Sequence, residues 1–87
     1  MQQETPERRA ALADEERRMR RLKLLVDLTT ALLRHHPLSR SEAYQTVEEL
    51  RARVLNLFPD KGEVFDLIYW PRFRRLIDNR FGPGGQL

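Results

Sequence analysis

The sequence predicts an all-α fold, a small bundle of three to four helices. Apolar residues recur at steps of three and four over most of the chain, which is the period of a helix with one buried face. Capping residues stand before these stretches, and no segment alternates apolar and polar residues as a half-buried strand does. We therefore expect a long N-terminal helix, two or three shorter ones, and a break or kink at Pro71 between the last two.

Domain boundaries follow from where the periodicity starts and stops. The chain has 87 residues, enough for one domain. Residues 1–5 show no period and are expected to be a disordered N-terminus, and residues 83–87 a flexible tail. Residues 6–82 then form a single helical domain. Within it, residues 6–21 are mostly charged residues and alanine, so we expect a charged, weakly packed helical extension.

The first helix is expected to start with Thr5 as its N-cap and Pro6 at the first helical position. In its charged half, Asp14–Arg18 and Glu16–Arg20 are pairs one turn apart in the favourable order. A broad apolar stripe follows from Leu22 to Leu33. His35-His36-Pro37 then ends the helix, because the residue before a proline avoids the α conformation.

The second helix has a sharp start signal. Ser39 and Glu42 match a capping box. In this motif the side chain of each residue accepts a hydrogen bond from the backbone amide of the other. Apolar residues continue in register from Ala43 to Leu57, and Pro59 ends the run.

The third helix is expected over residues 61–70, with Asp60 as its cap. Five large side chains cover most of its circumference, so it is predicted to be the most buried helix: Val64, Phe65, Leu67, Ile68 and Tyr69. After Pro71, a fourth helix places Phe73, Leu76, Ile77 and Phe81 on one face. Gly82 followed by Pro83 is a strong stop signal.

These patterns predict one apolar core drawn from all the helices. Its expected members are Leu25, Leu28, Leu32, Val47, Leu50, Val54, Phe65, Ile68, Phe73 and Leu76.

Composition narrows the functional classes. The chain has no cysteine, which excludes disulfides and thiolate metal sites and fits the reducing cytoplasm. Its apolar runs are too short to span a bilayer, and its start lacks the apolar segment of a secretory signal. The net charge is +3, from 16 basic and 13 acidic residues. We expect a cytoplasmic protein with no membrane partner and a solvated, mixed-charge surface.

The sequence contains no motif that is typical of a catalytic or metal-binding site. No nucleophile elbow, glycine-rich phosphate loop or paired metal-ligand motif occurs. His35 and His36 point about 100° apart on a helix, as its period of 3.6 residues dictates, and suit the helix C-terminus better than a metal. We expect no catalytic residue, no metal and no cofactor.

The strongest candidate for a binding surface follows Trp70. Its residues are Trp70, Arg72, Arg74, Arg75, Asn79 and Arg80. Arginine binds phosphate in bidentate fashion and tryptophan stacks on bases, but both residues also dominate protein–protein hot spots. A solvated helix face over a buried tryptophan explains the pattern as well.

The leading hypothesis is a small non-catalytic helical module for protein interaction, an adaptor or regulatory accessory protein. Its partner is a protein, with a second copy of the chain as one candidate. The alternative is a nucleic-acid-binding accessory protein that uses the basic C-terminal helix. The third helix is a poor reader of base edges, because it would present apolar side chains with the anionic Glu63 and Asp66.

Overall fold

The computed structural model describes residues 5–82, which form helices joined by short loops. Helix α1 spans Pro6–His35 and α2 spans Arg40–Leu57. Then α3 (Gly62–Val64), the π-helical turn η1 (Phe65–Tyr69) and α4 (Trp70–Phe81) follow one another without a gap. No strand occurs in this part of the chain, so the predicted all-α class is confirmed. Residues 1–4 and 83–87, expected to be disordered and flexible, lie outside the described residues.

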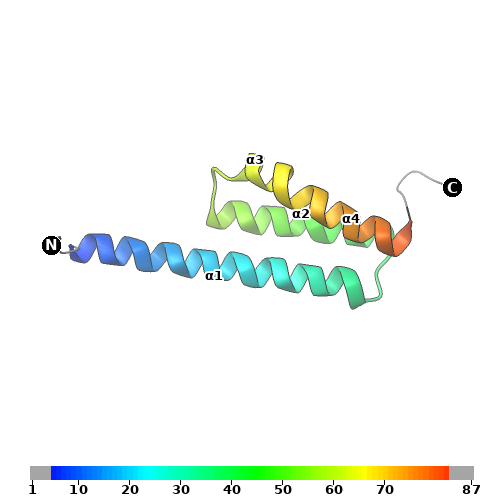
Figure 1. The fold of residues 1–87 in the computed structure, drawn as a ribbon, viewed down its shortest axis with the longest axis horizontal. Coiled ribbons are helices and arrows are strands. Elements are labelled where there is room, and N and C mark those ends of the chain that lie inside the picture. Colours follow the sequence, from blue (N-terminus) through cyan, green and yellow to red (C-terminus); the bar gives the residue numbers. More distant parts are fainter. Residues whose placement is uncertain (1–4, 83–87) are drawn as a thin grey trace.

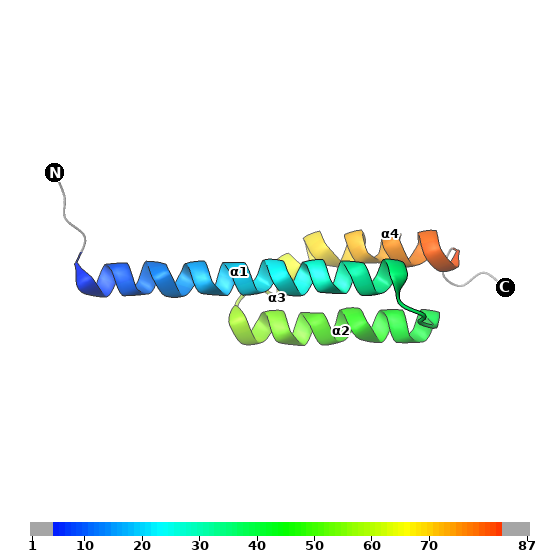
Figure 2. The same ribbon diagram turned by 90° about the horizontal axis from the view of Figure 1, so that it is seen from below.

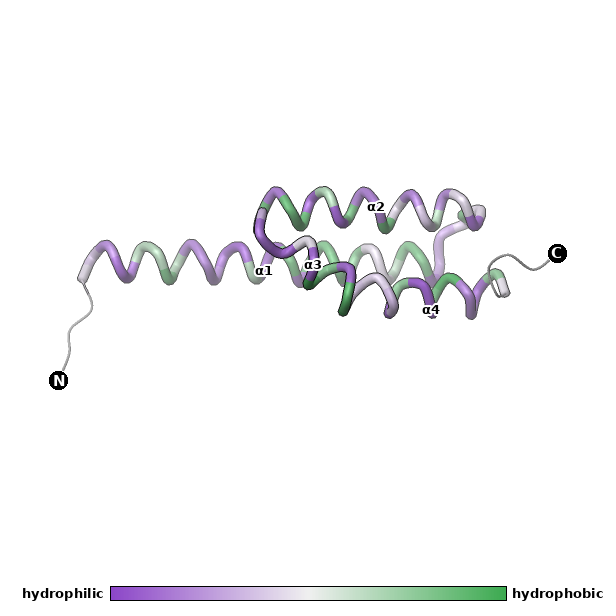
Figure 3. Tube along the Cα trace, turned by 90° about the horizontal axis from the view of Figure 1, so that it is seen from above, coloured by the Kyte–Doolittle hydropathy of each residue, from purple (hydrophilic) through white to green (hydrophobic). Residues whose placement is uncertain are grey.

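The three helical segments run up, down and up again. Figure 1 shows α2 returning antiparallel to α1, and α3–α4 returning along α2. A helix of 30 residues rises about 45 Å and one of 18 residues about 27 Å, at 1.5 Å per residue. The first part of α1 therefore overhangs the other helices (Figures 1 and 2), and the molecule measures 63 × 23 × 22 Å. Figure 3 shows that this overhang is mostly hydrophilic.

Local capping signals fix the starts of α1 and α2 as predicted. The Thr5 hydroxyl accepts a hydrogen bond from the Arg8 amide at 3.1 Å, and Pro6 occupies the first turn. Ser39 and Glu42 form the complete capping box, with bonds of 3.1 and 2.9 Å. Each cap satisfies amide groups that have no partner inside the helix.

The start of α3 differs from the prediction. Asp60 is not the cap: Lys61 holds that position, and no side chain caps the helix. The Lys61 amide instead donates to the Phe58 carbonyl at 3.0 Å, which closes a turn before the helix. At the other end, Gly82 has a φ of +87°, a conformation that favours glycine, so this part of the stop signal is confirmed.

Pro71 is accommodated by a wider turn directly before it. Proline has no amide hydrogen and its ring crowds the carbonyl four residues earlier. In η1 the Trp70 amide donates to the Phe65 carbonyl, five residues back. Such a turn takes up one extra residue. The eight steps from Phe65 to Phe73 then turn the helix as far as about seven regular α-helical steps, or two turns, so both side chains face the same way.

The buried core lies between the three helical segments. Its apolar members are Leu33, Ala43, Val47, Leu50, Val54, Phe65, Phe73 and Ile77. Five of them were expected, and two further expected members, Leu25 and Leu76, are half-buried. The prediction is wrong for Leu28, Leu32 and Ile68, which are exposed.

The errors have two physical causes. On α1 the apolar stripe is wider than its two neighbours can cover, so Thr29 and Leu33 are buried while Leu28 stays outside. On the third segment, η1 shifts the helical register, so that Phe65 is the only residue of α3 and η1 that is buried. The expectation that this segment is the most buried helix is therefore wrong.

Within residues 5–82, no helix combines the length and the low polarity that crossing a membrane requires.

Candidate functional site

One of the six predicted surface residues packs against the bundle, and a second, the exposed Arg74, lies over it. Trp70 is half-buried, and its ring centroid lies 6.0 Å from that of Tyr44 on α2. The Arg74 guanidinium lies 5.8 Å from the Trp70 ring, the range of a cation–π contact. Trp70 therefore serves to dock α4 on α2, with Arg74 covering it.

Arg80 is held by the fold itself. Its Nη1 donates to the Leu33 carbonyl at 2.9 Å, and its guanidinium lies 5.0 Å from the Phe81 ring. The Leu33 carbonyl belongs to the last turn of α1, where carbonyls have no partner inside the helix. Arg80 thus joins the C-terminal ends of α1 and α4.

The remaining three predicted residues, Arg72, Arg75 and Asn79, are exposed on α4. At steps of three and four they share one side of the helix. Within residues 5–82 neither arginine has an ion-pair partner. Arg72 lines a hollow between α1 and α4 together with Lys23 and Asp27.

Sequence analysis missed Arg40, which joins α2 to the end of α4. Its Nη2 donates to the carbonyls of Phe81 and Gly82 at 2.7 and 2.8 Å. Its Nη1 lies 3.7 Å from Asp78 Oδ1, too far for a hydrogen bond but close enough for an ion pair. The partners lie 41 and 42 positions away in the sequence, so no local pattern could reveal the contact.

A second ion pair joins α2 to η1. Arg51 donates from Nε and Nη2 to the two carboxylate oxygens of Asp66, at 2.8 and 3.0 Å. These hydrogen bonds lower the pKa of Asp66 and raise that of Arg51. At the start of α2, the hydrogen bond from the Ser39 amide is the main cause that lowers the pKa of Glu42. Both carboxylates are thus tied to the fold in their ionised form.

Apolar side chains gather on the surface at the end of the bundle beside the overhang. A hollow of about 200 Å³ opens there, lined by Met19, Leu22, Val54, Phe58, Lys61, Val64, Phe65 and Tyr69. Next to it, Leu67 is 69% exposed and Ile68 56% exposed. We call Met19, Val64, Leu67 and Ile68 the apolar face. Ile68 was expected in the core, and Val64 and Leu67 were expected to belong to the most buried helix, but all three side chains are exposed.

A second apolar strip follows α1 along α2. Leu24, Leu28 and Leu32 are exposed at four-residue steps. Two of them line a groove of about 160 Å³ with Thr46, Glu49 and Arg53 of α2. Unlike the apolar hollow, this groove has both an acidic and a basic residue in its lining, Glu49 and Arg53.

Three hydroxyl side chains that could serve chemistry take part in the fold. The Ser39 hydroxyl accepts the Glu42 amide, and the Thr30 and Thr46 hydroxyls donate to carbonyls one turn back. Among residues 5–82, no group of three or more histidine, aspartate or glutamate side chains is arranged to hold a metal ion. The arrangement offers surfaces for contact.

Comparison with known protein families, with curated proteins and with solved structures found no match to this chain.

Proposed function

We propose that this chain is a small non-catalytic helical module of the cytoplasm that binds a protein partner through the apolar face. The observation that carries the proposal is the exposure of Leu67 and Ile68 beside an apolar hollow. Contiguous apolar patches on small proteins mark interaction sites more often than chance exposure does. The hollow gives the patch the concave shape in which an anchoring side chain binds.

The energetics favour this face over the rest of the surface. Covering apolar area gains roughly 25 cal/mol per Å², and no charge has to be desolvated at Leu67 or Ile68. Arg51 and Asp66 are already paired at the edge of the same segment, which leaves them suited to a polar rim. An adaptor or regulatory accessory role follows from such a surface.

Site-specific photo-crosslinking in native extract tests the proposal. A photoreactive residue replaces Leu67, and a matched control replaces Gln45, which is exposed on α2. We expect adducts at position 67 whose mass is not a multiple of this chain, absent at position 45. An excess of the wild-type chain without the photoreactive residue should suppress these adducts, whereas an excess of the Leu67→Asp/Ile68→Asp variant should not. Equal labelling at both positions would contradict the proposal.

A second candidate is nucleic-acid binding through α4. It is favoured by the exposed Arg72 and Arg75, which have no ion-pair partner within residues 5–82. The expected bend at Pro71 belongs to this candidate, because it would turn these side chains and Asn79 toward one ligand. Arg80 is left out, since it binds the Leu33 carbonyl.

Salt dependence separates this candidate from the first. Binding to phosphates weakens steeply as salt rises, in proportion to the number of phosphates contacted. Affinity for a nonspecific duplex is measured at two salt concentrations, for the wild type and for Arg72→Glu/Arg75→Glu. No binding at low salt, or a response that salt does not change, removes nucleic acid as the partner.

A further inference from the structure

The overhang of α1 ends where the bundle begins. The Arg18 guanidinium lies 5.7 Å from the Phe58 ring, and Met19 lines the apolar hollow. The segment Pro6–Arg17 therefore extends beyond the other helices, as Figures 1 and 2 show. Its 12 residues rise about 18 Å, and all are exposed except the half-buried Ala13.

One side of this overhang carries an ordered pattern of charge. Leu12, 40% exposed, lies near its middle. Residues three and four apart are neighbours on a helix, so the basic Arg8 and Arg9 flank Leu12 on one side and the acidic Glu15 and Glu16 on the other. A shallow hollow lined by Leu12, Glu15, Glu16, Met19 and Arg20 shows that the acidic half shares the side of Leu12. We call Arg8, Arg9, Leu12, Glu15 and Glu16 the overhang face.

We propose that the overhang face binds the same face of a second copy of this chain, with the two helices antiparallel and crossing at Leu12. The inference goes beyond the proposed function, because it concerns a second surface, on α1, and a second copy of the chain as the partner there. Arg8 stands four residues before Leu12 and Glu16 four after, while Arg9 and Glu15 stand three before and three after. A two-fold axis at Leu12 brings each arginine opposite a glutamate of the other copy.

The same pattern disfavours parallel pairing. Parallel helices in register would set Arg8 against Arg8 and Glu15 against Glu15, and like charges that face each other repel. Antiparallel pairing also fits the length of the overhang. The helix of the second copy begins at Pro6, which falls opposite Arg18, where the bundle of the first copy starts. Pairing of the two helices therefore covers the length of the overhang.

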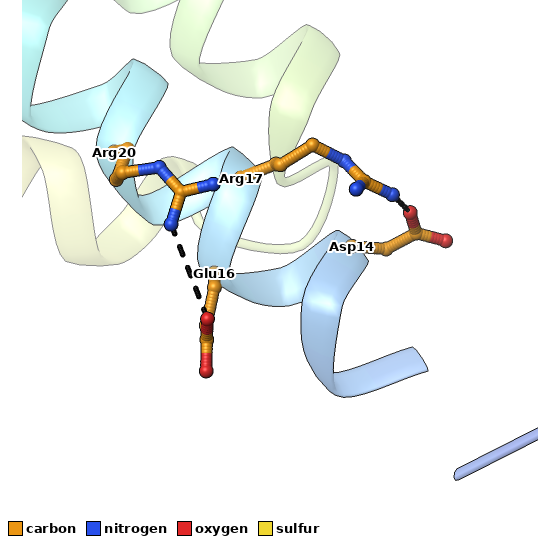
Figure 4. Close-up of polar contacts among 4 residues, drawn as sticks. All are labelled: Asp14, Glu16, Arg17 and Arg20. Carbon is orange, nitrogen blue, oxygen red and sulfur yellow. Dashed lines mark hydrogen bonds and ion pairs between the residues drawn. The ribbon is translucent and has the colours of Figure 1, made fainter. Parts of the chain in front are cut away.

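Contacts within the overhang leave its charges free to pair in this way. Figure 4 shows the two ion pairs there, Asp14–Arg17 and Glu16–Arg20. The second spans 3.9 Å between side chains that are 70% and 73% exposed, a kind of pair that contributes little. Within residues 5–82, the side chains of Arg8, Arg9 and Glu15 have no ion-pair partner. Among residues 5–82, association thus breaks one weak contact.

Charge reversal with rescue tests the inference. Sedimentation equilibrium of the full chain is measured from micromolar to millimolar concentration, and the wild-type mass should rise from 10.4 kDa toward twice that value. Arg8→Glu/Arg9→Glu and Glu15→Arg/Glu16→Arg should each stay at the mass of one chain, because every pair becomes repulsive. The variant that combines all four changes should regain the dimer. In a parallel dimer the combined variant would still repel itself, so this rescue reports the orientation.

Helical content by circular dichroism checks that each variant folds. A wild type that keeps the mass of one chain at millimolar concentration overturns the inference, and so does a dimer that either double variant retains. The outcome is separable from that of the proposed function. A monomer that still forms the adducts at position 67 overturns the self-association alone, whereas a dimer without those adducts overturns the protein-binding function of the apolar face alone.

Discussion

Arg40 shows how one side chain can hold distant helix ends together. Carbonyls at the end of a helix lack partners within it, and here the guanidinium of Arg40 supplies two donors to the end of α4. Arg80 does the same for α1 through the Leu33 carbonyl. The Phe81 ring lies within cation–π range of both arginines. These two basic residues therefore act in folding and contribute no free charge for a ligand.

Replacing Arg40 by Ala is expected to lower the free energy of unfolding by about 1.5–3 kcal/mol, the range for hydrogen bonds with a charged donor. Arg40→Lys should lie in between, because it keeps the charge and loses the forked geometry. The matched control is Arg53→Ala, an exposed arginine of the same helix, with an expected change within about 0.5 kcal/mol. Urea unfolding measures all three variants. Equal midpoints for Arg40→Ala and Arg53→Ala would show that the hydrogen bonds of Arg40 do not stabilise the fold.

Asp66 should make stability depend on pH. Its pKa is lowered in the folded state by the hydrogen bonds from Arg51. The stability that the ionised Asp66 contributes is complete above the ordinary carboxyl pKa of about 3.9. It is lost as the pH falls through the lower pKa of the folded state. Asp66→Asn should therefore lose less stability than the wild type between about pH 5 and about pH 2. Thermal unfolding across this range checks the difference, with Asp60→Asn as the exposed control. Parallel curves for wild type and Asp66→Asn would contradict it.

At the scale of elements, η1 decides which face of the last helical segment is buried. A regular α-helix would turn Phe65 and Phe73 about 80° apart, since eight residues exceed two turns by that angle. The extra residue in η1 removes the difference, and both rings are at most 1% exposed. Helical periodicity alone therefore gives the wrong facing here, and the only hint in the sequence is Pro71.

The facing of η1 predicts opposite outcomes for two neighbouring truncations. Phe65→Ala should lower the free energy of unfolding by about 3–5 kcal/mol, because it leaves a cavity in the core. Ile68→Ala should change it by less than about 0.5 kcal/mol, since this side chain is 56% exposed. Chemical unfolding followed by circular dichroism compares them. A large loss for Ile68→Ala would show that the segment is turned as the regular helix predicts.

For the whole molecule, the sequence is most informative where the signals are local. The caps at Thr5 and Ser39 and the stop at Gly82 each depend on neighbours a few residues away, and the structure confirms them. The hydrogen bonds of Arg40 join residues about half the chain apart, and no local sequence pattern indicates them. The apolar face escaped detection for a similar reason: large apolar residues indicate a core, and only the packed structure shows that too little protein surrounds Ile68 to cover it.

Met19 links the two proposed binding surfaces. It is 52% exposed and lines both the hollow beside Val64 and the hollow beside Leu12. An ammonium at this position would stand in an apolar hollow on one side, so it opposes burial there by desolvation. On the other side it would lie one turn from Glu15, which faces Arg9 of the second copy in the proposed dimer, so it repels that arginine. Met19→Lys should therefore weaken both self-association and crosslinking at Leu67, while keeping the fold.

The variants confined to one surface provide the comparison. Arg8→Glu/Arg9→Glu should abolish the dimer and keep the adducts at position 67, and Ile68→Asp should do the reverse, because distant sites without shared partners act independently. Met19→Leu, which conserves volume and polarity, should leave both readouts at the wild-type level. Sedimentation and crosslinking are measured on the same preparations. If Met19→Lys changes only one readout, the two surfaces do not meet at this residue, and the molecule then carries two separate contact surfaces.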